Sequence, residues 1–119
     1  MRGLLLFLAL MLLPATASAT QRVWIHELAA MPTASTGVSM QMGRLPVVAK
    51  QQVDITAGVQ TSAAFNAATR FIRVVCEVQC AVALNATATV TDVLLPALTP
   101  EYFGVPAGAG ATLSVIAAP

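Results

Sequence analysis

The chain of 119 residues is 57% hydrophobic and only 9% charged, and six basic residues against five acidic ones give a formal charge of +1. Soluble domains average about 45–50% apolar and about 25% charged residues, so this composition is unusual. No run of like charge occurs, which argues against a nucleic-acid binder with a basic patch and against a charged disordered tail. The length allows one domain. One His, one Trp and one Tyr leave little material for a metal cage or a base-stacking platform.

Residues 1–19 have the pattern of a secretory signal peptide. Arg2 supplies a positive charge, Leu4–Leu13 form an unbroken apolar run, and a small-residue stretch ends in Ala17-Ser18-Ala19. This order predicts cleavage between Ala19 and Thr20. The apolar run is shorter than the roughly 20 residues that a transmembrane helix needs. Two alternatives stay open: translation begins near Arg22, or the segment is retained as a buried or interfacial helix of the finished protein.

The first predicted strand is Arg22–Leu28, which is rich in β-branched and aromatic residues and precedes a break at Met31-Pro32-Thr33. Because both faces carry apolar side chains, we expect burial on both faces or contact of one face with a neighbouring subunit. The segment 34–44 is predicted to be a loop or a weak edge strand. Alternation divides the side chains of the strand into Val23 and Ile25 on one face and Trp24, His26 and Leu28 on the other.

A second strand is predicted to begin at Val47-Val48, directly after Pro46. Further along, Val53 and Ile55 alternate with Gln52 and Asp54, which is the period-2 pattern of a half-buried strand. The stretch Thr61–Thr69 is ambiguous. Its alanines permit a short helix, whereas its neighbours favour a strand that carries Phe65 into a core.

The clearest strand is Arg70–Val78. One face carries Ile72, Val74, Cys76 and Val78, and the other carries Arg73 and Glu77. Since Cys80, Val82 and Leu84 continue the alternation, the pattern predicts a hairpin turn at Glu77–Gln79.

The C-terminal third repeats the pattern of short strands and turns. Thr87–Thr91 is rich in β-branched residues, and Leu94-Leu95-Pro96 is predicted to end a strand. Glu101–Val105 and Ala111–Ile116 flank a Gly/Pro-rich turn and predict a final hairpin. Six to eight short strands without a sustained helical period indicate an all-β fold, either a small antiparallel β-sandwich or a jelly-roll-like barrel. We therefore expect a single domain over residues 20–119, preceded by the hydrophobic N-terminal leader.

Cys76 and Cys80 are the only cysteines. In an exported domain we expect them to form a disulfide across the turn, because directly opposed residues of an antiparallel pair lie about 4.5–5.5 Å apart at Cα. In the cytoplasm we expect two buried thiols instead. With His26 as the only imidazole, the pair cannot complete a four-ligand zinc site, so we expect neither a metal nor a cofactor.

The other candidate motifs predict no catalytic residue. His26 and Glu27 suggest acid–base chemistry, but no nucleophile motif accompanies them, and a strand histidine near an edge or interface is the preferred interpretation. Gly104, Gly108 and Gly110 are followed by a strand pattern instead of the helix that a phosphate-binding loop requires, so we interpret them as turn residues. The chain is therefore not expected to be an enzyme.

Two further motifs have structural alternatives. Asn85-Ala86-Thr87 is a formal N-glycosylation sequon, which has meaning only in a eukaryotic secretory pathway. Three methionines are either a soft contact surface or core filling: Met31, Met40 and Met42.

Several stretches resemble small proteins encoded by tailed bacteriophages and prophages. They are Ser62–Val74 (SAAFNAATRFIRV), Thr87-Ala88-Thr89 with Pro100–Gly108 (PEYFGVPAG) and a closing apolar strand, and Val23–Leu28. The likeness covers about residues 22–117. It implies a small β-structured virion component, such as a capsid decoration (cement) or head–tail accessory subunit, and brings no catalytic or binding residues with it. The leader departs from this pattern, since phage structural proteins assemble in the cytoplasm.

The sequence thus predicts a non-enzymatic structural subunit of a tailed-phage virion. Its expected partners are other copies of itself or phage capsid or tail proteins, without nucleic acid or a small-molecule substrate. Membrane contact is expected only through the leader, if the leader is retained, and a retained leader could insert into a neighbouring subunit. The alternative is an exported β-sandwich binding module, periplasmic or extracellular, with a cleaved signal peptide.

Overall fold

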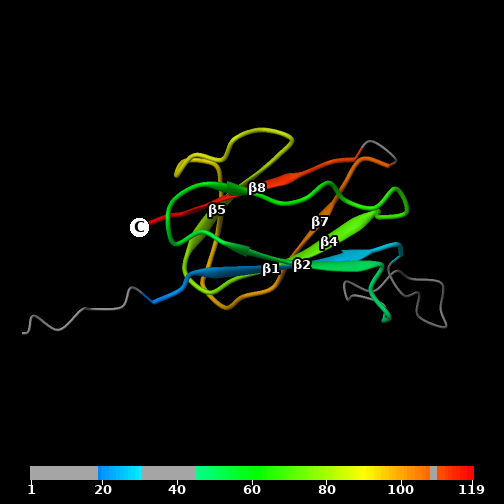
Figure 1. The fold of residues 1–119 in the computed structure, drawn as a ribbon, viewed down its shortest axis with the longest axis horizontal. Coiled ribbons are helices and arrows are strands. Elements are labelled where there is room, and N and C mark those ends of the chain that lie inside the picture. Colours follow the sequence, from blue (N-terminus) through cyan, green and yellow to red (C-terminus); the bar gives the residue numbers. More distant parts are fainter. Residues whose placement is uncertain (1–18, 31–44, 108–109) are drawn as a thin grey trace, which may run out of the picture.

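The computed structural model describes residues 19–30, 45–107 and 110–119, and these form eight strands and no helix. They build two four-stranded antiparallel sheets that lie face to face (Figure 1). The first sheet has the order β2-β1-β4-β7 and the second the order β3-β8-β5-β6. The all-β prediction is confirmed for these residues, and the arrangement is consistent with a small β-sandwich. The strands are β1 (Arg22–Leu28), β2 (Ala49–Asp54), β3 (Gln60–Thr61), β4 (Phe71–Cys76), β5 (Cys80–Leu84), β6 (Val93–Leu95), β7 (Glu101–Gly104) and β8 (Leu113–Ala117).

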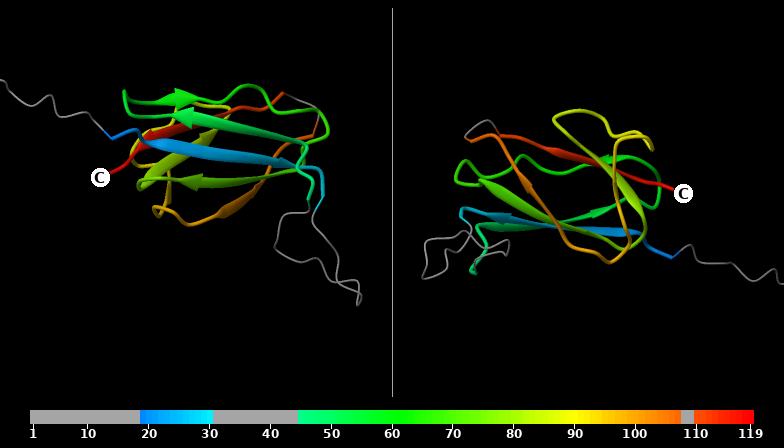
Figure 2. Two further views of the ribbon diagram at one scale, coloured as in Figure 1. Left: turned by 60° about the horizontal axis from the view of Figure 1, so that its bottom comes forward. Right: turned by 180° about the vertical axis from the view of Figure 1, so that it is seen from behind.

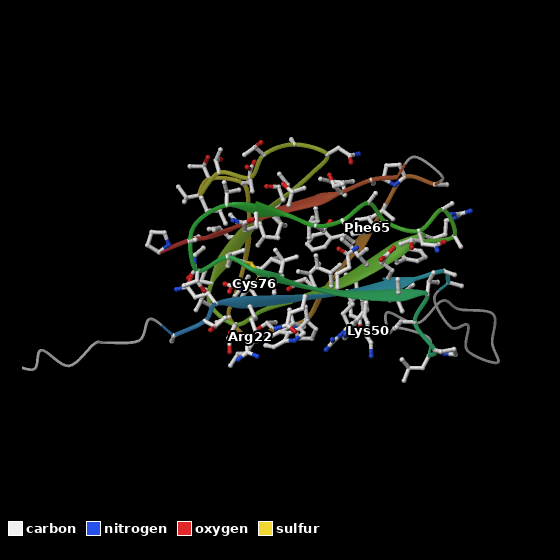
Figure 3. The ribbon with its side chains drawn as sticks, in the orientation of Figure 1. Arg22, Lys50, Phe65 and Cys76 are labelled. Atoms are coloured by element: carbon white, nitrogen blue, oxygen red, sulfur yellow. A yellow bond between two sulfur atoms is a disulfide. The ribbon has the colours of Figure 1, made fainter. Side chains whose placement is uncertain are left out.

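The core lies between the sheets and consists mainly of the inward-facing side chains of their strands. Val23 and Ile25 of β1 are fully buried and belong to one cluster with the inner side chains of β4, β5 and β8. Phe65 also enters this core, as Figure 3 shows, although its segment is neither helix nor strand: β3 ends at Thr61. Leu28 is buried too, so burial at this end of β1 includes a residue of the face predicted to carry Trp24 and His26.

The six strands β3–β8 pair as an antiparallel ribbon that is rolled across the core, and β2 pairs with β1 beside it. β5 pairs with β6, β4 with β7, β3 with β8 and β2 with β1. Successive pairs alternate between the two sheets, so most connections along the chain cross from one sheet to the other (Figure 2). β1 completes the first sheet, because it pairs on its other side with β4.

Two predicted hairpins are wrong, because the chain passes from one sheet to the other at both turns. β4 and β5 lie in different sheets, so the turn at Glu77–Gln79 joins the sheets instead of two paired strands. Likewise, β7 pairs with β4 while β8 pairs with β5 and β3, so the segment after Val105 crosses between sheets. Alternation specifies which face of a strand is buried, but it does not specify which strand lies alongside.

A disulfide joins the two sheets at the connection between β4 and β5. The sulfurs of Cys76 and Cys80 are bonded, with 6.3 Å between the Cα atoms, and both residues are fully buried. Three chain segments meet around this corner. The backbone N–H of Glu77 donates to the carbonyl of Arg22, and that of Leu98 donates to the carbonyl of Cys76. The disulfide therefore closes an inter-sheet corner and not the hairpin that the sequence predicted.

Glu27 is a buried carboxylate on the inner side of β1. Its Oε1 accepts hydrogen bonds from the backbone N–H of Asn66 at 2.6 Å and from the hydroxyl of Thr69 at 2.8 Å. Its Oε2 accepts one from Nε2 of Gln51 at 3.2 Å, and the same amide group bonds both the N–H and the carbonyl of Ala63. Burial of a charge is tolerated only when its oxygens are satisfied in this way. Glu27 therefore fixes the loop 62–69 against β1 and β2.

Reduction of the disulfide is expected to lower the free energy of unfolding by about 2 kcal/mol, because a cross-link over so short a loop removes a correspondingly small conformational entropy from the unfolded chain. The cysteines are separated by four positions. Urea denaturation with and without a reducing agent measures the effect. The double variant Cys76→Ala/Cys80→Ala is the control, since its stability should not respond to the reductant. Identical wild-type curves under both conditions would contradict the prediction.

Glu27→Gln is expected to lower the free energy of unfolding by about 1–3 kcal/mol, because the new amide NH₂ replaces an acceptor where only donors converge. Glu77→Gln is the matched control. The Glu77 carboxylate lies 3.7 Å from Nε of Arg22 in a partly exposed pair, so its loss should cost less than about 1 kcal/mol. Equal destabilisation by the two substitutions would show that the buried network does not stabilise the loop.

Candidate functional site

His26 and Glu27 do not form an acid–base pair, because successive side chains of a strand point to opposite faces. Glu27 is buried on the inner side, whereas His26 is half-buried on the outer side of the first sheet. His26 does lie in a strand, but β1 pairs on both sides, so the prediction of a position near a sheet edge is wrong. What surrounds His26 on the outer face is the feature that the sequence did not predict.

The outer face of the first sheet carries its side chains in transverse rows. His26 lies opposite Lys50 on β2 and opposite Arg73 on β4. Arg73 in turn lies opposite Tyr102 on β7, so four residues form one row across the sheet. Trp24 lies two residues from His26 on β1, in the next row. Figure 3 shows the Lys50 side chain on the side of the sheet that faces away from the core. We call these five residues the outer-face cluster: Trp24, His26, Lys50, Arg73 and Tyr102.

The cluster holds two cations without a carboxylate. All five acidic residues of the chain lie in the part that the structure describes, and there the one ion pair within 4 Å joins Arg22 and Glu77. Nη1 of Arg73 lies 3.4 Å from Nδ1 of His26, so a neutral imidazole with its proton on Nε2 accepts this contact. Burial, together with the charges of Arg73 and Lys50, holds the pKa of His26 below its ordinary value of 6.5.

Two open depressions flank His26 on this face. One of about 330 Å³ is lined by residues of β1 and β2, with Trp24 and Lys50 among them. The other, of about 280 Å³, is lined by Arg73 and Tyr102 and by the apolar side chains of Leu28, Leu45 and Val47. Each depression therefore combines one aromatic ring with one cation, and the imidazole of His26 borders both.

A second exposed surface surrounds β6, the edge strand of the second sheet. Val93 is 56% exposed and Leu94 51%, and Val90 and Leu98 nearby are exposed as well. In the whole segment 85–100 the only charged residue is Asp92. Soluble proteins usually protect an edge strand with charges, and exposed apolar side chains on a free edge are typical of a contact surface. We call Val90, Val93, Leu94 and Leu98 the apolar edge.

An apolar cavity of about 330 Å³ lies beside the apolar edge, where the two sheets separate. Ile72 and Phe103 of the first sheet and Val82, Val93 and Leu113 of the second are among its lining residues. Val93 thus belongs both to the exposed edge and to the mouth of the cavity. Part of the cavity wall belongs to the core, because Ile72, Val82 and Leu113 are core residues.

The remaining sequence motifs occupy structural positions. Asn85 has a positive φ of 55°, and its Oδ1 accepts a hydrogen bond from the backbone N–H of Thr112 at 3.0 Å. Gly110 has a φ of +60° between β7 and β8, as expected of a turn residue. Ala19 and Thr20 are exposed, and cleavage between them stays a prediction. Met31, Met40, Met42 and Gly108 lie outside the described residues.

Within the ranges 19–30, 45–107 and 110–119, no group of three or more His, Cys, Asp and Glu side chains could hold a metal ion. The same ranges contain no helix that is long and apolar enough to span a membrane.

The pKa of His26 is expected to lie below 6.5 and to rise towards that value in Arg73→Gln, which removes a neighbouring cation. Since the chain has a single histidine, NMR titration of the imidazole measures this pKa without overlap. Arg70→Gln is the charge-matched control, because Arg70 bonds the carbonyls of Ala67 and Thr69 instead. Because the pKa of His26 is lower in the folded chain than in the unfolded chain, the unfolded chain takes up the imidazole proton first as the pH falls. The free energy of unfolding should therefore decrease as the pH drops below about 6.5. If Arg70→Gln raised the pKa of His26 as much as Arg73→Gln, the shift could not be assigned to the charge of Arg73.

No family model matches the chain, and no curated protein and no solved structure matches it either.

Proposed function

We propose that the chain is a non-catalytic structural subunit that joins an assembly through its apolar edge. The exposure of Val93 and Leu94 on a free edge strand carries this proposal. A partner that covers them gains by removing apolar surface from water, at roughly 25 cal/mol per Å². The unpaired backbone groups of β6 add hydrogen-bonding capacity for a partner strand. The neighbouring cavity provides room for an apolar side chain of that partner.

We further propose that this assembly is the virion of a tailed bacteriophage, with the subunit as a capsid decoration or head–tail accessory protein. The support is the resemblance over residues 22–117 and the weakly charged composition, which favours association. The ribbon-like strand pairing supports a jelly-roll-like form of the β-sandwich, an architecture that viral capsid domains use. The proposed partners are other copies of the chain or capsid or tail proteins.

An exported binding module is the second candidate, and the disulfide favours it. Disulfides persist in oxidising compartments and are rare in the cytoplasm. Together with the signal-peptide pattern of residues 1–19, the Cys76–Cys80 bond fits a periplasmic or extracellular protein. The intact mass of the purified protein separates the two candidates: a first residue of Thr20 supports export, and a first residue of Met1 excludes cleavage.

Wild-type protein is expected to self-associate with rising concentration or to co-purify with phage particles, and Leu94→Lys should weaken both, because it places a charge at the centre of the apolar edge. Sedimentation of the protein alone and mass spectrometry of particles from a phage that encodes it are the measurements. Val59→Lys is the matched control, since Val59 is also exposed but lies outside the apolar edge. A wild-type chain that is strictly monomeric and absent from particles would refute the assembly proposal.

A further inference from the structure

We propose that the outer-face cluster is a binding site for a carboxylate-bearing polysaccharide. The cluster lies on the first sheet, whereas the apolar edge belongs to the second. The inference therefore goes beyond the assembly function and does not depend on it.

The charges of the cluster call for an anionic ligand. Lys50 and Arg73 lie on either side of His26, two strand spacings apart, which is about 10 Å. Neither has a carboxylate within 4 Å in the described part of the chain, which contains every Asp and Glu. A guanidinium group binds a carboxylate through two parallel hydrogen bonds. A ligand with carboxylates spaced by about the length of a disaccharide could therefore engage both cations at once.

The aromatic side chains call for a ligand with flat apolar faces. Trp24 borders the depression on the Lys50 side of His26, and Tyr102 borders the depression on the Arg73 side. A pyranose ring has an apolar face of C–H groups that packs on an aromatic ring, while its hydroxyls lie at the rim. The rim here offers a hydrogen-bonding group in the amide of Gln52, which lies opposite Trp24 on β2. Each depression thus has the groups that one charged sugar unit needs.

The size of the face argues against a folded protein as the ligand. The outer face spans three strand spacings in one direction and the length of a six-residue strand in the other, which gives it an area of about 300 Å². A stable protein–protein interface buries about 800 Å² on each partner. An extended peptide would bind poorly across the strands, because the backbone groups of this face already pair within the sheet and peptides add to free edges instead. An extended glycan needs no backbone partners, so it fits a narrow track over β2, β1, β4 and β7.

Isothermal titration of the purified protein with oligogalacturonate at low ionic strength tests the proposal. Binding is expected, and Arg73→Gln should weaken it about tenfold or more, because a charge-assisted pair of hydrogen bonds is lost. Arg73→Lys keeps the positive charge but lacks the planar guanidinium group, so its affinity should lie between those of the wild type and Arg73→Gln. Trp24→Ala should weaken binding as well, and Arg70→Gln, which removes a charge away from the cluster, should leave it within about twofold of wild type.

Circular dichroism and thermal unfolding establish that each variant folds as the wild type does. The absence of binding to oligogalacturonate, or an equal loss in Arg70→Gln and Arg73→Gln, would overturn the proposal. Binding of neutral dextran with the same affinity would exclude the role of the cations, and tighter binding of poly-L-glutamate would assign the site to acidic peptides instead. Leu94→Lys should bind the glycan like the wild type, so a failed glycan experiment and a failed assembly experiment are distinguishable.

Discussion

The pairing of β1 with both β2 and β4 is the interaction on which the first sheet depends. β1 is the first strand in the chain, yet it lies in the interior of the sheet, between strands that follow it by more than twenty residues. Its inner side chains, Val23 and Ile25, bury apolar surface in the core, and its hydrogen bonds to both neighbours set the register. That register places His26 between Lys50 and Arg73. The core and the outer-face cluster are thus two consequences of the same pairing.

Glu27 restricts this register further. A shift of β1 by one residue would turn Glu27 to the outer face and His26 to the core, leaving the donors of Asn66 and Thr69 without their acceptor. Buried donors that lose their partners cost more than an ordinary hydrogen bond contributes. The carboxylate therefore acts against alternative pairings as well as holding the loop 62–69. Gln51 extends the same effect to β2, since its amide bonds both Glu27 and the backbone of Ala63.

Short-range sequence patterns predicted the strands and their alternating faces. They did not predict which strands pair, because pairing depends on contacts between residues far apart in the sequence. The alternation in Arg70–Val78 separated the buried side of β4 from its outer side, whereas the apolar residues on both faces of Arg22–Leu28 left the buried side of β1 undecided. Phe65 lies in the core, as the strand alternative expected, although its segment is neither strand nor helix. The pairing partners of β5 and β8 could not be predicted from the sequence, because a rolled ribbon and a series of hairpins show the same alternation of apolar and polar residues. The outer-face cluster was missed for the same reason: its members are far apart in sequence. The burial of Glu27 did have a signal, since it continues the inner period of Val23 and Ile25.

The scarcity of charge gives the two surfaces their distinct character. Within the described residues, most charged side chains are engaged locally: Glu27 in the buried network, Arg22 with Glu77, Asp54 with Thr56 and Asp92 with Thr89. Lys50 and Arg73 are not neutralised, and both lie on the outer face of the first sheet. The apolar edge, by contrast, has almost no charge to keep it apart from a partner. The proposed association through the edge strand would leave the cations of the first sheet in solvent, so it and the proposed ligand binding would not compete for the same residues.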